Sequence, residues 1–144
     1  MEIKILDKNH ASMLYEVERE CFSKPWTEAM FLGDLESENT IYLGAFKDGV
    51  MVGYAGAWLV AGDADITNVA VIPEVRRQGV AKTLLFELFL KLLENAGETV
   101  RLEVRRSNEN ARSLYEKMGF SEIAVRKNYY ADPCEDALIY EKNL

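Results

Sequence analysis

The stretch ITNVAVIPEVRRQGVAKTLLFELFLKLLEN, residues 66–95, decides how this chain folds. Its first part is rich in β-branched residues and stops at Pro73, which is typical of a strand that ends there. Its last part places leucines at the 3.6-residue period, and more apolar residues widen that face. We therefore expect a strand over 65–72 and a long, largely buried helix over 79–95, joined by one short turn.

The turn, Arg76-Arg77-Gln78-Gly79-Val80-Ala81, has the composition of a phosphate-binding loop. Gly79 allows an unusual φ angle and close backbone approach, so consecutive N–H groups can point into one concavity at the positive end of the helix dipole. Arg76, Arg77 and Lys82 would add positive charge at the opening of the same concavity. The turn matches neither GxxxxGK[ST] nor GxGxxG, which argues against a nucleoside triphosphate or dinucleotide site. A surface turn with solvated arginines is the alternative.

The rest of the chain predicts six more strands and three more helices around this unit. Alternating or β-rich runs predict strands over 2–6, 40–46, 50–59, 99–104, 120–125 and 137–141. Spacing and capping signals predict helices over 10–22 and 108–118, and a short one capped by Thr27. Asp48-Gly49 is a strong hairpin signal. The order β-αα-βββ-α-β-α-ββ predicts an α/β (α+β) fold with a mixed sheet, in a single domain over 1–144.

Composition and charge exclude several classes of function. The net charge of −7 argues against nonspecific nucleic-acid binding, and fits either attraction of a cationic partner or plain solubility. No run approaches the ~20 apolar residues of a membrane span, and the N-terminus lacks a signal-peptide pattern, so we expect a cytoplasmic protein without membrane contact. His10, Cys21 and Cys134 lack zinc-ligand spacing, so we expect no metal site and packed rather than reactive thiols.

Two residues could carry acid–base chemistry. Glu103 belongs to the predicted strand 99–104, on the face opposite to the strand's apolar side chains. It could act as a general base at a cleft, or belong to a polar face held in ion pairs. Tyr115 shares a helical stripe with Leu114 and Met118, and could be either a core tyrosine or a general acid.

Arg76-x-x-Gly79-x-Ala81 resembles the [RQ]-x-x-G-x-[GA] pyrophosphate loop of the GNAT acetyltransferases. The preceding strand, the segment over 108–120 and the order of elements also resemble that family, from one end of the chain to the other. Ala81 stands where many relatives have Gly, which the family pattern permits. The resemblance implies a mixed, mostly antiparallel seven-stranded sheet flanked by about four helices, and acetyl-CoA as the co-substrate.

The resemblance also implies roles for individual residues. The strand before the loop would offer backbone groups to the pantetheine arm, and the loop would hold the pyrophosphate. The implied cofactor-binding residues are Val69, Ala70, Val71, Arg77, Gln78, Gly79, Val80, Ala81, Lys82 and Asn108. Asn108 could also be a simple N-cap, and the two roles can coexist. Glu103 would take the amine proton, Tyr115 would protonate the leaving CoA thiolate, and the amine would attack directly, without an acetyl-cysteine.

Several segments narrow the resemblance to the bacterial ribosomal-protein-alanine N-acetyltransferases. These are residues 22–28, 68–71, 77–79, 102–105, 114–116, 126–130 and 135–137. This implies that the acceptor is the N-terminal alanine of small-subunit ribosomal protein eighteen, or its N-terminal peptide. Trp26 between the first two helices, and Tyr129 and Tyr130 after the sixth strand, would flank that peptide, unless they are ordinary loop-packing residues.

The acceptor is the least determined part of this interpretation. The connection over 130–135 looks shorter than in those relatives, and we expect it to line the acceptor site. A lysine or small-molecule amine is therefore an alternative acceptor. A second alternative is a non-catalytic acyl-CoA-binding module, although the presence of Glu103 and Tyr115 argues against it.

Overall fold

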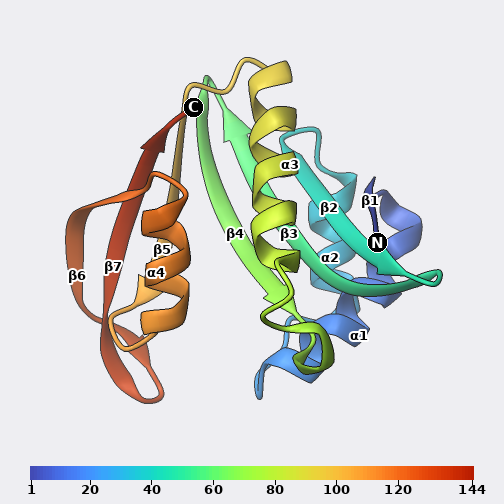
Figure 1. The fold of residues 1–144 in the computed structure, drawn as a ribbon, viewed down its shortest axis with the longest axis horizontal. Coiled ribbons are helices and arrows are strands. Elements are labelled where there is room, and N and C mark those ends of the chain that lie inside the picture. The colour runs from blue at the N-terminus through green and yellow to red at the C-terminus, as the bar shows by residue number, and fades with distance from the viewer.

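The computed structural model describes residues 1–144 and holds one seven-stranded sheet with helices on both faces (Figure 1). The strands are β1 Glu2–Ile5, β2 Thr40–Lys47, β3 Val50–Val60, β4 Asp63–Val71, β5 Thr99–Arg105, β6 Ser121–Ala131 and β7 Cys134–Asn143. The helices are α1 Ala11–Cys21, α2 Glu28–Glu36, α3 Val80–Glu94 and α4 Glu109–Lys117, with 3-10 turns at Lys8–His10 and Pro73–Val75. The predicted order of elements is confirmed.

The sheet has the strand order β1-β2-β3-β4-β5-β7-β6. Only β4 and β5 run parallel, and every other neighbouring pair is antiparallel, which confirms the expected mixed, mostly antiparallel sheet. Helix α3 makes the crossover between β4 and β5, as a parallel connection requires. Helices α3 and α4 cover one face of the sheet, while α1 and α2 lie on the other (Figure 1).

The parallel pair is short, and the sheet splits where it ends. Backbone pairing between β4 and β5 runs only from Asp63 opposite Thr99 to Asp65 opposite Arg101. Beyond that point the two strands diverge (Figure 1). The register of β4 against β3 shifts just there, leaving Thr67 as an extra residue. Such a bulge bends its strand and increases its twist, which turns β4 away from β5.

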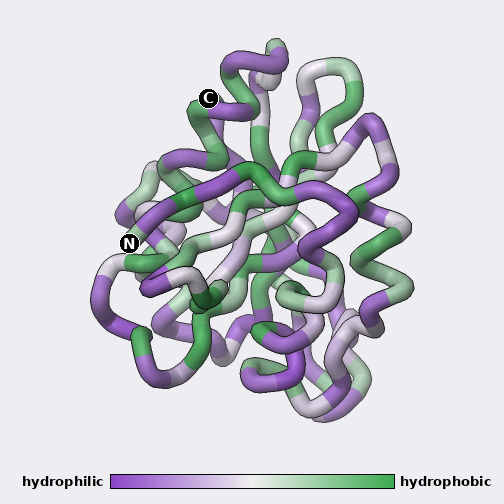
Figure 2. The backbone as a smooth tube through the Cα atoms, turned by 90° about the vertical axis from the view of Figure 1, so that its right-hand side faces the viewer, coloured by the Kyte–Doolittle hydropathy of each residue, from purple (hydrophilic) through white to green (hydrophobic).

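Two apolar clusters hold the layers together. Under α3 and α4 the larger cluster includes Leu84, Leu88 and Leu92, which are fully buried. Under α1 and α2 the smaller cluster is built around Leu14 and Phe31. In Figure 2 the green, hydrophobic stretches pass through the middle of the molecule, and purple dominates the outer loops. Four helices are thus fixed on the sheet by their inner faces.

The extent of burial of α3 is one correction to the sequence analysis. Phe86, Leu90 and Leu93 are 57%, 40% and 49% exposed, so the helix is buried on one side only. The sequence suggested fuller burial of α3 because its apolar face is wide. Spacing along the helix does not separate the exposed apolar side chains from those that pack inward. None of the four helices combines the length and apolarity that a transmembrane span requires.

Strand β6 is the other correction. It continues six residues beyond the expected end at residue 125, so Tyr129 and Tyr130 lie within the strand and not after it. Nearly every residue of β6 is exposed, so no hydrophobic alternation marks its second half. Strands β6 and β7 form one long hairpin with its turn at Asp132 and Pro133.

Candidate functional site

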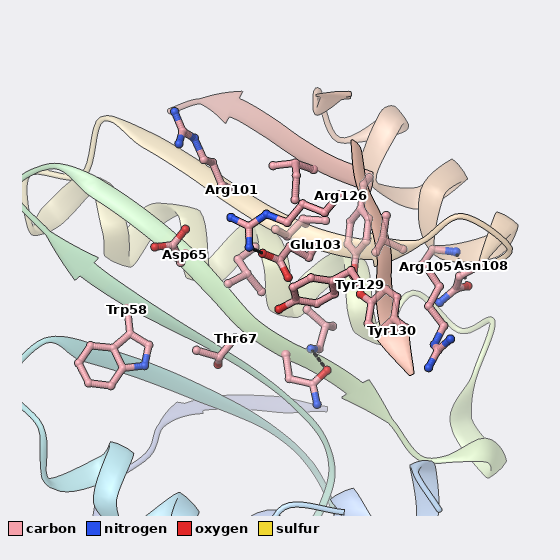
Figure 3. A pocket seen from close by; sticks show the side chains of 18 of the residues that line it. Trp58, Asp65, Thr67, Arg101, Glu103, Arg105, Asn108, Arg126, Tyr129 and Tyr130 are labelled. Carbon is pink, nitrogen blue, oxygen red and sulfur yellow. Dashed lines mark hydrogen bonds and ion pairs between the residues drawn. The ribbon is translucent and has the colours of Figure 1, made fainter. Parts of the chain in front are cut away.

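The divergence of β4 from β5 opens a cavity of about 790 Å³. Its walls include residues 65–69 of β4 and 101–105 of β5, with Glu103, Tyr129 and Tyr130 close together in Figure 3. Residues of α4, β6 and the loop between α1 and α2 complete the lining. Seven of the predicted site residues line it: Trp26, Val69, Glu103, Asn108, Tyr115, Tyr129 and Tyr130. Residues far apart in the sequence, from both halves of the sheet, therefore meet at one opening.

Glu103 lies on the polar face of β5, as the alternation of that strand predicted. Its Oε1 is 3.3 Å from Nη1 of Arg126 on β6, and Figure 3 shows the two side chains facing each other. The Glu103 carboxylate also raises the pKa of the Tyr129 phenol. Glu103 is therefore in an ion pair and also lines the cavity, while its role as a general base stays a prediction.

Tyr115 comes from α4, on the other face of the sheet. Its ring packs against Phe120 and Tyr140, with centroid distances of 5.7 and 6.4 Å. No side-chain hydrogen bond of the protein involves its hydroxyl, which belongs to the wall of the cavity. Burial, with a smaller contribution from Tyr130, raises the pKa of Tyr115 to about 12. The phenol therefore stays protonated at neutral pH and is available as a hydrogen-bond donor.

Asn108 begins α4 and borders the same cavity. Its Oδ1 accepts a hydrogen bond of 3.2 Å from the backbone N–H of Ala111, which makes it the N-cap of the helix. The capping role foreseen from the sequence is therefore real, and it coexists with a place in the cavity wall.

The three aromatic side chains predicted to flank an acceptor all line the cavity. Tyr129 and Tyr130 come from β6, and their rings lie 5.1 Å apart and nearly perpendicular. Trp26 comes from the loop between α1 and α2, on the far side of the split, and packs against Phe31 at 5.4 Å. Of residues 130–135, only Tyr130 lines this cavity, and the expectation that the connection lines the acceptor site stays a prediction.

A buried carboxylate behind the cavity was missed in the sequence. Glu18 of α1 is only 3% exposed and accepts hydrogen bonds from the Tyr54 hydroxyl at 2.5 Å and the Trp26 backbone N–H at 3.2 Å. The Asn68 amide donates to the same carboxylate at 3.3 Å. A signal was present, because Glu18 follows Leu14 by four residues on the apolar stripe of α1.

The predicted phosphate loop forms the turn from β4 to α3, outside the cavity wall. Gly79 is the N-cap of α3 with a left-handed φ of 79°, and a Cβ there would meet nothing within 4 Å. Arg77 is also left-handed, with φ of 64°. No side chain caps the helix, so the N–H groups of its first turn are free to bind an anion. This backbone geometry fits a pyrophosphate.

Arg76 departs from its predicted part in that loop. Its Nε donates a hydrogen bond of 2.8 Å to the carbonyl of Val71, so its guanidinium is tied to β4 instead of adding free charge at the opening of the concavity. The Cys21 thiol donates to the same carbonyl at 3.4 Å. The carbonyl of Val71, expected to face the cofactor, is therefore occupied.

The other two strand residues expected at the cofactor differ from each other. Val69 lines the cavity, but its N–H donates to the Asn68 side-chain oxygen at 3.0 Å. Ala70 points the opposite way and is buried under α1 and α2. Of the three residues Val69, Ala70 and Val71, only Val69 lines the cavity.

Neither cysteine has the environment of a nucleophile. Burial raises the pKa of the Cys21 thiol and outweighs the opposing effect of the nearby Arg76 guanidinium. Cys134 is exposed beside the β6–β7 turn and does not line the cavity. No three His, Cys, Asp or Glu side chains gather in an arrangement that could hold a metal ion.

Comparison with known proteins places this geometry in context. A model of the acetyltransferase (GNAT) family matches residues 11–120. A Bacillus subtilis protein, named as a candidate [ribosomal protein bS18]-alanine N-acetyltransferase, is 43% identical over 88% of this chain and 84% of its own length. The [ribosomal protein bS18]-alanine N-acetyltransferase of Escherichia coli K12 is 34% identical over 95% of this chain and 93% of its own.

Solved structures agree with the family match. The crystal structure of the Escherichia coli ribosomal-protein-S18-alanine N-acetyltransferase superimposes with a TM-score of 0.92, at 33% identity, covering 99% of this chain and 92% of that one. The PaiA N-acetyltransferase of Thermoplasma acidophilum, solved with coenzyme A, has a TM-score of 0.82 over the full length of both chains. At 23% identity, that second likeness shows a shared fold only.

Proposed function

The chain belongs to the acetyltransferase (GNAT) family, whose members use acetyl-CoA, and on this premise we propose that it acetylates the N-terminal alanine of ribosomal protein bS18. The observation that carries the proposal is the single cavity where Glu103 and Tyr115 approach the split from opposite faces of the sheet. The acceptor is supported by the two bacterial relatives whose names state it and which this chain matches over most of their length.

In this proposal the cofactor lies along the split and ends at the turn before α3. Acetyl-CoA supplies an acetyl group activated as a thioester. The backbone N–H groups of residues 77–82 and the positive end of α3 would bind its pyrophosphate, with Arg77 and Lys82 adding charge. Backbone groups of β4 beyond Asp65 have no partner on β5, and those that are not bonded to the Asn68, Cys21 and Arg76 side chains would hold the pantetheine arm.

Glu103 and Tyr115 divide the proton transfers. An α-amine has a pKa near 8 and must lose its proton to attack, so Glu103, directly or through a water, would accept that proton. Tyr115 would donate to the departing sulfur. Because the Tyr115 pKa of about 12 lies well above that of a thiol, it would stabilise the thiolate by a hydrogen bond and need not release its proton.

The aromatic residues of the cavity wall would contact the acceptor peptide. Trp26, Tyr129 and Tyr130 present flat apolar faces with polar edges, which suit a short extended peptide better than a long flexible side chain. The net charge of −7 favours a basic acceptor such as a ribosomal protein.

A screen of acceptors tests the proposal. CoA release and mass spectrometry would compare a basic peptide that starts with alanine, the same peptide with a blocked N-terminus and free lysines, and small amines. We expect modification of the free alanine amine alone. Modification of lysines or small amines only would move the assignment to the alternative acceptors. Saturable acetyl-CoA binding without CoA release on any amine would favour the non-catalytic module.

A further inference from the structure

Three arginines line the cavity, and they differ in how firmly they are held. Arg101 donates to the Glu141 carboxylate at 2.5 Å. Arg105 donates to the carbonyl of Pro133 at 3.0 Å and stacks on Tyr130, with its guanidinium carbon 4.2 Å from the ring centre. Both guanidinium groups therefore have strong partners of their own, other than Glu103.

Arg126 has one polar partner, the Glu103 carboxylate, at 3.3 Å. Its other contact is a loose one with the Tyr129 ring, 5.6 Å from the centroid. The side chain is 59% exposed, so moving it costs no buried packing. Among the cations of the cavity, Arg126 is thus the one that can leave its place most easily.

Strand register explains how the pair forms across an intervening strand. Glu103 of β5 lies opposite Ile139 of β7, while Arg126 of β6 lies opposite Ala137, two residues further along β7. The two long side chains therefore meet diagonally over β7 (Figure 3). Ala137 is too small to obstruct them, and the ion pair closes over the wall of the cavity beside Tyr129.

We propose that Arg126 is an internal competitor of the acceptor, a cation that occupies the place of the acceptor's ammonium group at Glu103 until an acceptor displaces it. The inference rests on the function proposed above. A free N-terminal amine arrives as a cation and can replace the guanidinium at the carboxylate, so no charge is left unpaired. A neutral or N-blocked terminus brings no cation and makes no such exchange, so its binding should not depend on Arg126.

Binding measurements separate this role from a structural one. Calorimetry would compare a basic peptide that starts with alanine and its N-acetylated form on the wild-type protein, Arg126→Gln and Arg126→Lys. Without its competitor, the free-amine peptide should bind Arg126→Gln about two- to fivefold tighter, the size of one exposed ion pair, and the blocked peptide about equally well. Arg126→Lys keeps a cation and should behave like the wild type.

Lys127→Gln is the matched control. It removes the same charge from the next residue of β6, whose partner Asp136 lies outside the cavity, so affinity for both peptides should hold. The gain from Arg126→Gln should also vanish in a Glu103→Gln background, because no carboxylate is left to compete for. The inference would be overturned by a gain in affinity that persists in the Glu103→Gln background, or by an equal change in affinity for both peptides. Weaker binding of the free-amine peptide to Arg126→Gln would also overturn it.

These measurements test the role of Arg126 separately from the identity of the acceptor. If the free-amine peptide binds with the expected contrast but is not acetylated, Arg126 keeps its role and the proposed function fails. If that peptide is acetylated but shows no contrast between the variants, the proposed function stands and the role of Arg126 fails. If neither peptide binds the wild-type protein, both are overturned.

Discussion

The Tyr54 hydroxyl of β3 donates a 2.5 Å hydrogen bond to the Glu18 carboxylate of α1, in the interior behind the cavity. The same carboxylate holds the backbone N–H of Trp26 and the amide of Asn68. A buried carboxylate is tolerated because such donors replace the water it loses. This network therefore joins the loop that carries Trp26 to the central strands, and fixes the position of Trp26 in the cavity wall.

Removing the Tyr54 hydroxyl should destabilise the fold. Tyr54→Phe leaves Glu18 with one donor fewer in a buried site, and we expect the free energy of unfolding to fall by about 1.5–3 kcal/mol, the range for hydrogen bonds to charged groups. Urea denaturation measures this free energy of unfolding. Tyr15→Phe is the control, because Tyr15 is partly buried but makes no side-chain hydrogen bond, and its loss should change stability little. Equal stability of both variants would contradict this account.

Stability should decline in alkali. Burial is the main cause that raises the pKa values of Tyr42, Tyr54 and Tyr115 above the ordinary value. Above about pH 10 the unfolded chain loses protons that the folded chain keeps, so this contribution is complete below that pH and is lost as pH rises further. Urea titrations across that range should show a falling free energy of unfolding. The decline should be shallower in Tyr54→Phe, and a flat profile would be inconsistent with buried neutral tyrosines.

Gly79→Val should weaken acetyl-CoA binding by at least about tenfold, because its backbone conformation shapes the anion site. The open space around Gly79 shows that the cause is its left-handed φ and not crowding within the protein. Calorimetry on the folded variant measures the loss. Gly33→Ala, in a helix with open space around it, is the control that should bind normally. Unchanged affinity in a folded Gly79→Val would remove the loop from the cofactor site.

Glu103→Gln should lower kcat/KM for the acceptor by roughly 10² at neutral pH, the low end of general acid–base contributions. Glutamine keeps the size of the side chain but cannot accept the amine proton. The deficit should shrink as pH rises, since more of the amine is then neutral without help. A pH–rate profile of both proteins checks this. A deficit that is constant with pH would mean that Glu103 only positions the acceptor.

Tyr115→Phe should leave folding intact and slow the reaction. Because its hydroxyl makes no hydrogen bond within the protein, stability should change by less than about 0.5 kcal/mol. The ring still packs against Phe120 and Tyr140. We expect kcat to fall by about 10–10² and acetyl-CoA affinity to stay within a few fold. Melting temperature and kcat, measured on one preparation, distinguish a catalytic role of Tyr115 from a structural one. Lost stability with a normal kcat would mean that Tyr115 is a core residue.

Local patterns in the sequence predicted most elements of the fold. Asp48 and Gly49 form the expected hairpin turn, both with positive φ, and Thr27 caps α2 as expected. These features depend on neighbouring residues alone. The second half of β6 escaped prediction because it is held by pairing with β7 while its side chains stay exposed, so no hydrophobic period records it.

The candidate site was predictable residue by residue but not as an arrangement. Glu103 and Tyr115 became candidates through strand alternation, helix spacing and a family resemblance. The split that brings them together follows from the bulge at Thr67, which no Gly or Pro in the sequence marks. The partner of Glu103 was unforeseen because Arg126 reaches it across an intervening strand. Contacts of that kind depend on register, which short patterns do not specify.

The short stretch of pairing between β4 and β5 also affects how proteins with this fold can evolve. The turn for the anion lies beside one half of the sheet, whereas the two tyrosines and Arg126 belong to the hairpin of the other half. Substitutions in that hairpin alter what is presented to an acceptor without disturbing the register of the first four strands. On the function proposed above, acceptor preference can therefore change by substitutions in this hairpin while the cofactor site stays the same.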